Sequence, residues 1–121
     1  MKENLFGAIR NILIVFLTLG MVGAGMIKLV GLPEVREWFD RWGFPIWTQI
    51  IIGLLEIGIG LAIFIPKTRQ LAIWALLGEM LIATTLHIYF GEYLDVRGPM
   101  GVIIASGLLL FADKKTRDTA L

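Results

Sequence analysis

Four long apolar runs, separated by short polar segments, dominate the pattern of the chain. They cover about residues 5–27, 46–65, 70–90 and 99–112. A bilayer core of about 30 Å is crossed by roughly 20 helical residues, so the first three runs have the length of membrane spans. The fourth run is shorter and spans only if its polar flanks snorkel or the bilayer thins locally. None of the runs alternates between apolar and polar residues, as the strands of a membrane barrel do. We therefore predict an all-α, polytopic fold: a four-helix transmembrane bundle in a single domain, residues 1–121.

A short amphipathic helix is predicted between the first two spans. Pro33 suits the first turn of a helix, and Gly43 with Pro45 suits its end. The large apolar side chains of this segment recur at the spacing of one helix face: Val35, Trp38, Phe39 and Trp42. We expect the helix to lie at the membrane interface, where Trp38, Phe39 and Trp42 form an aromatic belt, a lid over the bundle or a surface for a partner.

Basic residues predict the orientation in the membrane. Of the Lys and Arg residues, seven lie at the two termini and in the loop between the second and third spans, and four lie on the other side. Because basic loops stay in the cytoplasm, we expect a multi-pass protein of the cytoplasmic membrane with both termini inside. The first run is too long for the core of a typical signal peptide, and we expect it to be retained.

The composition narrows the chemistry. The chain is 57% hydrophobic and 17% charged, against about 45–50% and 25% in soluble domains, so lipid is its main solvent. Without cysteine, it has no thiol for disulfide exchange, an iron–sulfur cluster or a cysteine-based zinc site. We expect no covalently bound cofactor. The net charge of +1 gives no footprint for nucleic acid.

Two acidic residues lie in the middle of predicted spans. Glu56 is in the second run and Glu79 in the third, and because these spans run in opposite directions, the two carboxylates reach a similar depth. A charge at this depth costs at least about 2.5–3.5 kcal/mol, so it requires a role. Small residues share a helix face with each acid, which predicts that both acids face the bundle; these residues are Gly53 and Gly60 on one helix and Ala72, Ala75 and Ala83 on the other.

Three further polar residues are predicted nearer the non-cytoplasmic face: Lys28, Gln49 and His87. We expect a polar pocket with Glu56 and Glu79 at its floor and these three side chains around its walls. Two carboxylates close together in a low dielectric do not both stay ionised, so one is expected to hold a proton.

Four interpretations of this pocket stay open. It is a structural network that fixes the helix register, a site for a quinone headgroup or a similar small molecule, part of a proton or ion pathway, or a metal site. One histidine and two or three carboxylates are thin support for a metal. We therefore predict no metal and assign no catalytic residue.

An ordered series of motifs resembles the DoxX-like family of small membrane proteins. It begins with the run 24–33, AGMIKLVGLP, and continues through Phe39, the Gly-Phe-Pro of 43–45, the Gly-Leu-Leu-Glu of 53–56, and residues 66–69. It ends with Ala72, Met80, Ala83 and His87. The positions that match the family motifs are Gly25, Lys28, Pro33, Glu56 and His87, whereas Glu79 is singled out by helical geometry alone.

The resemblance implies a four-helix membrane fold and two classes of function. Members of the family include membrane subunits of quinone-linked sulfur oxidation, partners in oxidoreductase assemblies, and chaperones for channel assembly. In the first class the pocket holds a quinone, and a membrane or soluble redox partner brings the redox centre. In the second class the protein is a non-catalytic assembly or binding protein that engages another membrane protein or a second copy. The chain has no cysteine and in this respect differs from any family member that uses a thiol.

Overall fold

The computed structural model describes the backbone of residues 2–120 and the side chains of residues 4–118. The elements in chain order are α1 (Lys2–Val30), α2 (Pro33–Trp42), α3 (Ile46–Phe64), α4 (Arg69–Tyr89), the 3₁₀ helix η1 (Tyr93–Val96) and α5 (Arg97–Ala120). The described part of the chain contains no strand, and α1, α3, α4 and the segment from η1 through α5 are long and apolar enough to cross a membrane. This confirms the predicted all-α four-helix bundle.

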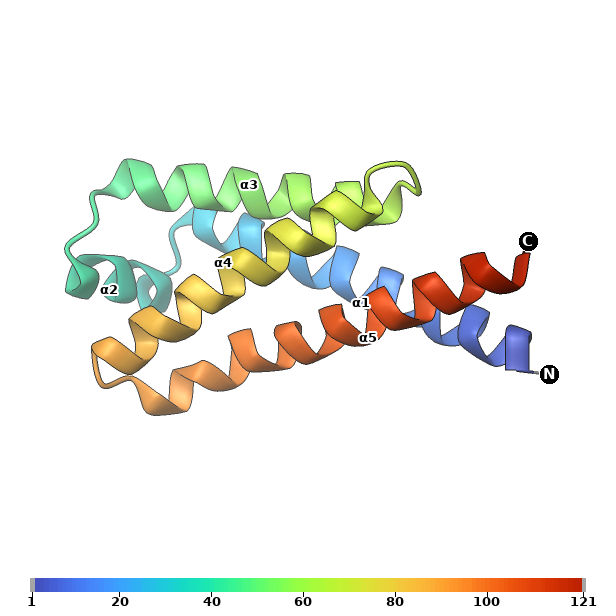
Figure 1. Cartoon of the computed structure of the whole chain (residues 1–121). Helices are drawn as coiled ribbons and strands as arrows, with labels where there is room; N and C mark the ends of the chain where they lie inside the picture. The colour runs from blue at the N-terminus through green and yellow to red at the C-terminus, as the bar shows by residue number, and fades with distance from the viewer. Residues whose placement is uncertain (1, 121) are drawn as a thin grey trace.

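The two ends of the bundle differ in what they carry. Both termini and the turn between α3 and α4 lie at one end, here called the terminal end (Figure 1). The short helix α2 and the turn between α4 and α5 lie at the other end, here called the α2 end (Figure 1). The α2 end therefore holds the amphipathic helix that the sequence predicts between the first two spans.

The fourth span is longer than its apolar run. The candidate span covers Tyr93–Asp118, against the predicted range of 99–112. Asp113, the first charged residue after the run, lies within the helix and is buried against Arg69 of α4. With its additional turns the helix has the length to cross a bilayer without local thinning. The 3₁₀ helix η1 in the preceding turn is a second feature that the hydrophobic pattern did not predict.

The bounds of α2 follow from its end residues. Pro33 occupies the first turn, where its missing N–H costs no hydrogen bond. Gly43 has a left-handed backbone (φ 81°), and its N–H donates to the carbonyl of Asp40 at 3.1 Å. The N–H of Phe44 reaches back to the carbonyl of Phe39 at 2.9 Å, so the helix closes as a Schellman-type cap.

Helices α1 and α3 pack closely through glycines. A Cβ atom added to Gly53 would lie 2.9 Å from the carbonyl oxygen of Gly25, and one added to Gly60 would lie 3.0 Å from that of Thr18. These backbones are therefore in direct contact, as in other membrane helix pairs with small interface residues. On α4 the predicted stripe of small residues faces the bundle only in part, because Ala72 is buried and Ala75 is exposed.

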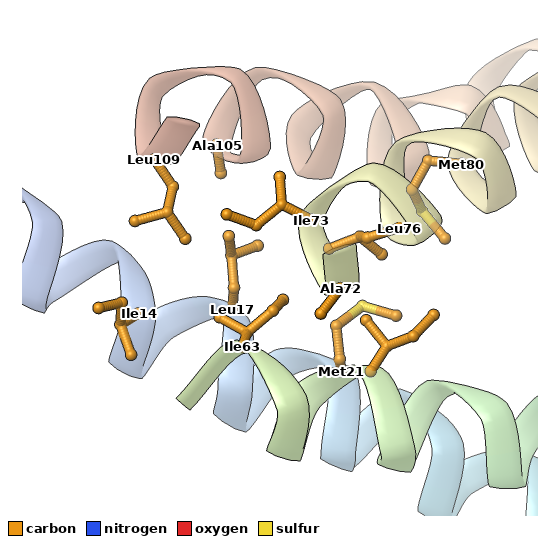
Figure 2. Packing of buried hydrophobic residues seen from close by; sticks show 11 residues of the cluster. Ile14, Leu17, Met21, Ile63, Ala72, Ile73, Leu76, Met80, Ala105 and Leu109 are labelled. Carbon is orange, nitrogen blue, oxygen red and sulfur yellow. The ribbon is translucent and has the colours of Figure 1, made fainter. Parts of the chain in front are cut away.

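Large apolar side chains from all four long helices meet in one core (Figure 2). The most deeply buried are Leu17 of α1, Ile63 of α3, Ile73 and Leu76 of α4, and Leu109 of α5. Many other large apolar residues point outward, as expected where lipid replaces water around the helices. The core lies in the half of the bundle nearer the termini and leaves the half nearer α2 for the functional groups.

Candidate ligand-binding cavity

A cavity of about 640 Å³ lies in the half of the bundle nearer α2. Its wall comes from α1, α3, α4, the start of α5 and the overlying α2, and most of it is apolar; contributing side chains include Phe16, Met21, Ile52, Ala83, Leu86 and Val102. Four of the predicted pocket residues line it: Lys28, Glu56, Glu79 and His87. The volume is in the range of sites for small organic ligands, about 300–1,000 Å³.

Lys28 neutralises Glu56. The Nζ of Lys28 lies 2.7 Å from Oε1 of Glu56, and the two side chains are 16% and 4% exposed. Lys28 stands in the last turn of α1, and Glu56 is about 15 Å along α3. The lysine reaches the acid because the close contact between Gly25 and Gly53 brings the backbones of these helices together. Of the two basic residues predicted on the pocket wall, Lys28 and His87, the geometry assigns Lys28 as the partner of Glu56.

Glu79 lies beside this ion pair. It interacts with Glu56 and is within electrostatic reach of Lys28. Both carboxylate oxygens of Glu79 are buried, and no described residue makes a hydrogen bond of normal geometry to either one. One ammonium group therefore faces two carboxyl groups. A buried site of this kind is satisfied by a proton on one acid or by a donor group on a ligand.

His87 belongs to a different cluster, the Glu92 latch, which comprises Arg41, Trp42, His87 and Glu92. The Nδ1 of His87 lies 2.8 Å from Oε1 of Glu92, and the same oxygen accepts a hydrogen bond from Nε1 of Trp42 at 3.1 Å. Arg41 donates to the other oxygen of Glu92. The latch joins α2 to the turn after α4, so α2 is held over the cavity by a buried carboxylate.

The aromatic residues of α2 take part in the cavity wall. Trp38, Phe39 and Trp42 all line it, and Phe39 is buried. The rings of Trp38 and Trp42 meet the imidazole of His87 edge-on, at centroid distances of 5.1 and 5.2 Å. Of the arrangements considered for α2, this geometry is the one expected of a lid.

The other predicted site residues lie elsewhere. Gln49 does not line the cavity, because its Nε2 donates to the carbonyl of Lys28 at 2.9 Å and ties the start of α3 to the end of α1. Gly25 supports the contact between α1 and α3, and Pro33 begins α2. Both motif residues therefore shape the site without contributing functional groups to it.

From the sequence, Glu92 is expected in the non-cytoplasmic loops and within reach of the pocket mouth, but its pairing with His87 was not predicted. A signal was present, because Gly91 stands between the helix and this acid. With a left-handed backbone (φ 74°), Gly91 reverses the chain and returns Glu92 toward His87. The pair of His87 and Glu92 could have been predicted from this pattern: a histidine near the end of a helix, then a glycine that ends the helix, then an acid.

A candidate metal site is formed by His87, Glu92 and Asp95. Their potential ligand atoms lie within 4.8 Å of one another. The oxygens of Glu92 are already engaged by Arg41, Trp42 and His87. A metal ion would have to displace the proton shared by His87 and Glu92 and would lie near the positive charge of Arg41. The geometry therefore favours a hydrogen-bonded latch over a metal centre.

Glu92→Gln is expected to loosen the lid. Hydrogen bonds to charged groups contribute about 1.5–3 kcal/mol, so loss of the Glu92 charge should make opening of α2 easier and speed amide hydrogen exchange in residues 33–42 by roughly tenfold or more. The measurement is hydrogen–deuterium exchange with mass spectrometry. Glu37→Gln is the matched control, because Glu37 is an exposed acid on α2 itself. Equal exchange in the two variants would show that the latch does not hold α2.

Comparison with protein families identifies the chain. The sequence model described as the DoxX-like family matches residues 12–111. The match covers most of the chain, including all of α3 and α4 and most of α1 and α5, so the protein belongs to this family, and the resemblance seen in its motifs is confirmed. Searches among curated proteins and among solved structures give no match.

Proposed function

We propose that this DoxX-like protein is a membrane subunit or accessory of a quinone-linked oxidoreductase and that its cavity binds the quinone. The observation that carries the proposal is an apolar cavity whose floor presents Lys28, Glu56 and Glu79. A lipid-soluble ligand with a polar headgroup suits such a site, because its apolar part fills the walls and its headgroup meets the few polar groups.

The cavity residues fit a quinone headgroup in particular. Quinone oxygens accept hydrogen bonds, and the floor offers donors in the ammonium of Lys28 and in a protonated Glu79, whose oxygens have no protein partner of normal geometry. When Glu92 accepts from Nδ1–H of a neutral His87, the Nε2 of the ring is an acceptor that suits a quinol hydroxyl. A bound quinone would supply two-electron, two-proton redox chemistry, and the protein would supply position, hydrogen bonds and exclusion of water.

The proposal requires a partner. The chain has no cysteine and hence no thiol-based redox chemistry of its own, so a membrane or soluble partner protein carries the electrons to or from the quinone. The orientation is part of the proposal: the terminal end, which is rich in Lys and Arg, faces the cytoplasm in the cytoplasmic membrane. The cavity then lies toward the opposite face.

Decylubiquinone should quench the tryptophan fluorescence of the purified protein in a saturable way, because Trp38 and Trp42 line the cavity. Ala83→Phe places a ring in the cavity and is expected to weaken this binding roughly tenfold or more. Leu81→Phe adds a similar ring on the exposed face of α4 and should leave binding unchanged. Equal, unsaturable quenching in all three proteins would contradict the proposal.

Mass spectrometry of the protein extracted in mild detergent adds an independent test. A co-purified quinone supports the proposed function. Its absence, together with Glu56→Gln and His87→Ala proteins that fold but no longer retain a membrane protein partner, would favour the second class, a non-catalytic assembly protein. The two classes therefore differ in what the variants lose: a small molecule in one and a protein in the other.

A further inference from the structure

A second charged cluster lies at the terminal end, separate from the cavity. Its centre is Asp113 of α5, which is buried. Gln70 donates to its Oδ2 at 2.8 Å, and Arg117 lies 3.6 Å from that oxygen. Arg69 and Arg10 approach Oδ1 at 3.4 and 4.0 Å. Three guanidinium groups, from α1, α4 and α5, thus gather around one carboxylate.

Arg69 has a structural role in this cluster. Its Nε donates to the carbonyl of Ile63 at 2.8 Å, and its Nη2 donates to that of Phe64 at 3.2 Å. These carbonyls belong to the last turn of α3 and have no partner in the helix itself. Arg69 therefore caps α3 while it pairs with Asp113, and the side chain is only 9% exposed.

Arg10 and Arg117 remain open to the surroundings. Their side chains are 26% and 57% exposed, and each reaches Asp113 with one nitrogen at a distance longer than a normal hydrogen bond. Asp113 is already paired with Arg69, so most of the charge of these two arginines is not cancelled locally. Exposed Lys114 lies beside Asp113 in the chain, and Lys67 lies in the turn that precedes Arg69.

The position of the cluster at the terminal end places it near lipid headgroups. Both termini and the turn between α3 and α4 lie at this end of the bundle (Figure 1), so the cluster falls in the headgroup layer when the four helices cross a bilayer. Guanidinium groups bind phosphate oxygens through paired, charge-assisted hydrogen bonds. We propose that Arg10 and Arg117 bind the phosphate of an anionic phospholipid and that Asp113 and Arg69 hold the two arginines in place.

The test compares lipids in thermal unfolding of the protein in mild detergent. Phosphatidylglycerol should raise the unfolding temperature more than phosphatidylcholine does, because only the former carries a net negative charge. The R10Q/R117Q protein should bind phosphatidylglycerol roughly tenfold more weakly, and its fold is expected to persist because Arg69 and Gln70 still engage Asp113. R36Q/R97Q removes two arginines at the α2 end and should respond as the unaltered protein does.

Three results would overturn the lipid site. They are an equal response to both lipids, an unchanged response of R10Q/R117Q, and a response to inorganic phosphate as large as that to phosphatidylglycerol, which would indicate a site for free phosphate. Native mass spectrometry provides a second readout by counting bound phosphatidylglycerol. It should show at least one lipid fewer on R10Q/R117Q than on R36Q/R97Q, and equal numbers would also contradict the proposal.

Discussion

Gly25→Ala is expected to destabilise the protein by about 1–3 kcal/mol, which is the usual cost of forcing an extra carbon into a packed core. A Cβ atom at this position would collide with the backbone oxygen of Gly53 and would lie 2.6 Å from Cγ1 of Ile57. The backbone oxygen belongs to α3, so the conflict is relieved only if α1 and α3 move apart. Thermal unfolding in detergent would show a lower midpoint than that of the unaltered protein.

Gly23→Ala is the matched control for this prediction. No atom lies within 4 Å of a Cβ placed at Gly23, although the residue is on α1 itself, two positions away. This substitution should leave the stability of the protein unchanged or increase it, since alanine is favoured over glycine by about 1 kcal/mol inside a helix. A similar loss of stability in both variants would mean that the close approach of α1 to α3 is not what Gly25 provides.

Separating α1 from α3 is also expected to change the geometry of the cavity. Lys28 is three residues from Gly25, and Glu56 is three residues from Gly53. A shift between the glycines therefore lengthens the ion pair between Lys28 and Glu56, which is 2.7 Å in the intact protein. Gly25 is thus expected to affect ligand binding although it does not line the cavity.

Most of the fold could be predicted from the sequence because lipid imposes simple rules. A helix that crosses the bilayer needs a long apolar run, and such runs predicted α1, α3 and α4 closely. Pro33 and Gly43 predicted the ends of α2 through backbone chemistry alone. The length of α5 was not predictable in this way, because the helix continues past its apolar run through Asp113, whose partner Arg69 comes from another helix.

The candidate site was predictable where helical geometry sets the direction of a side chain. Depth and helix face pointed Glu56 and Glu79 toward a shared cavity, and both line it. Gln49 lies on the expected face, but its long side chain reaches a backbone carbonyl instead of the cavity. The contact of Glu92 with His87 is formed by the turn after α4. Hydrophobic periodicity does not predict which side chains a turn brings together.

Lys28→Met is expected to destabilise the protein by about 3–5 kcal/mol, the usual cost of removing one partner of a buried ion pair. It leaves Glu56 and Glu79 side by side without a positive charge. Glu56→Gln should cost less, because Lys28 remains within electrostatic reach of Glu79, which then takes the place of Glu56. The measurement is again thermal unfolding in detergent, with the exposed Lys67→Met as a control expected to stay within about 0.5 kcal/mol.

Combined variants separate the loss of a charge from the loss of a side chain. If Lys28→Met acts by leaving two acids without a counter-charge, then Lys28→Met with Glu56→Gln and Glu79→Gln should regain most of the lost stability, since all three charges are then absent. Equal losses for Lys28→Met and Glu56→Gln, or no recovery in the triple variant, would show that Lys28 contributes through packing alone. Recovery would instead establish that the floor of the cavity is an electrostatic unit of one amine and two acids. The triple variant would then keep the volume of the cavity without its ionisable groups and would serve as the reference protein for quinone binding.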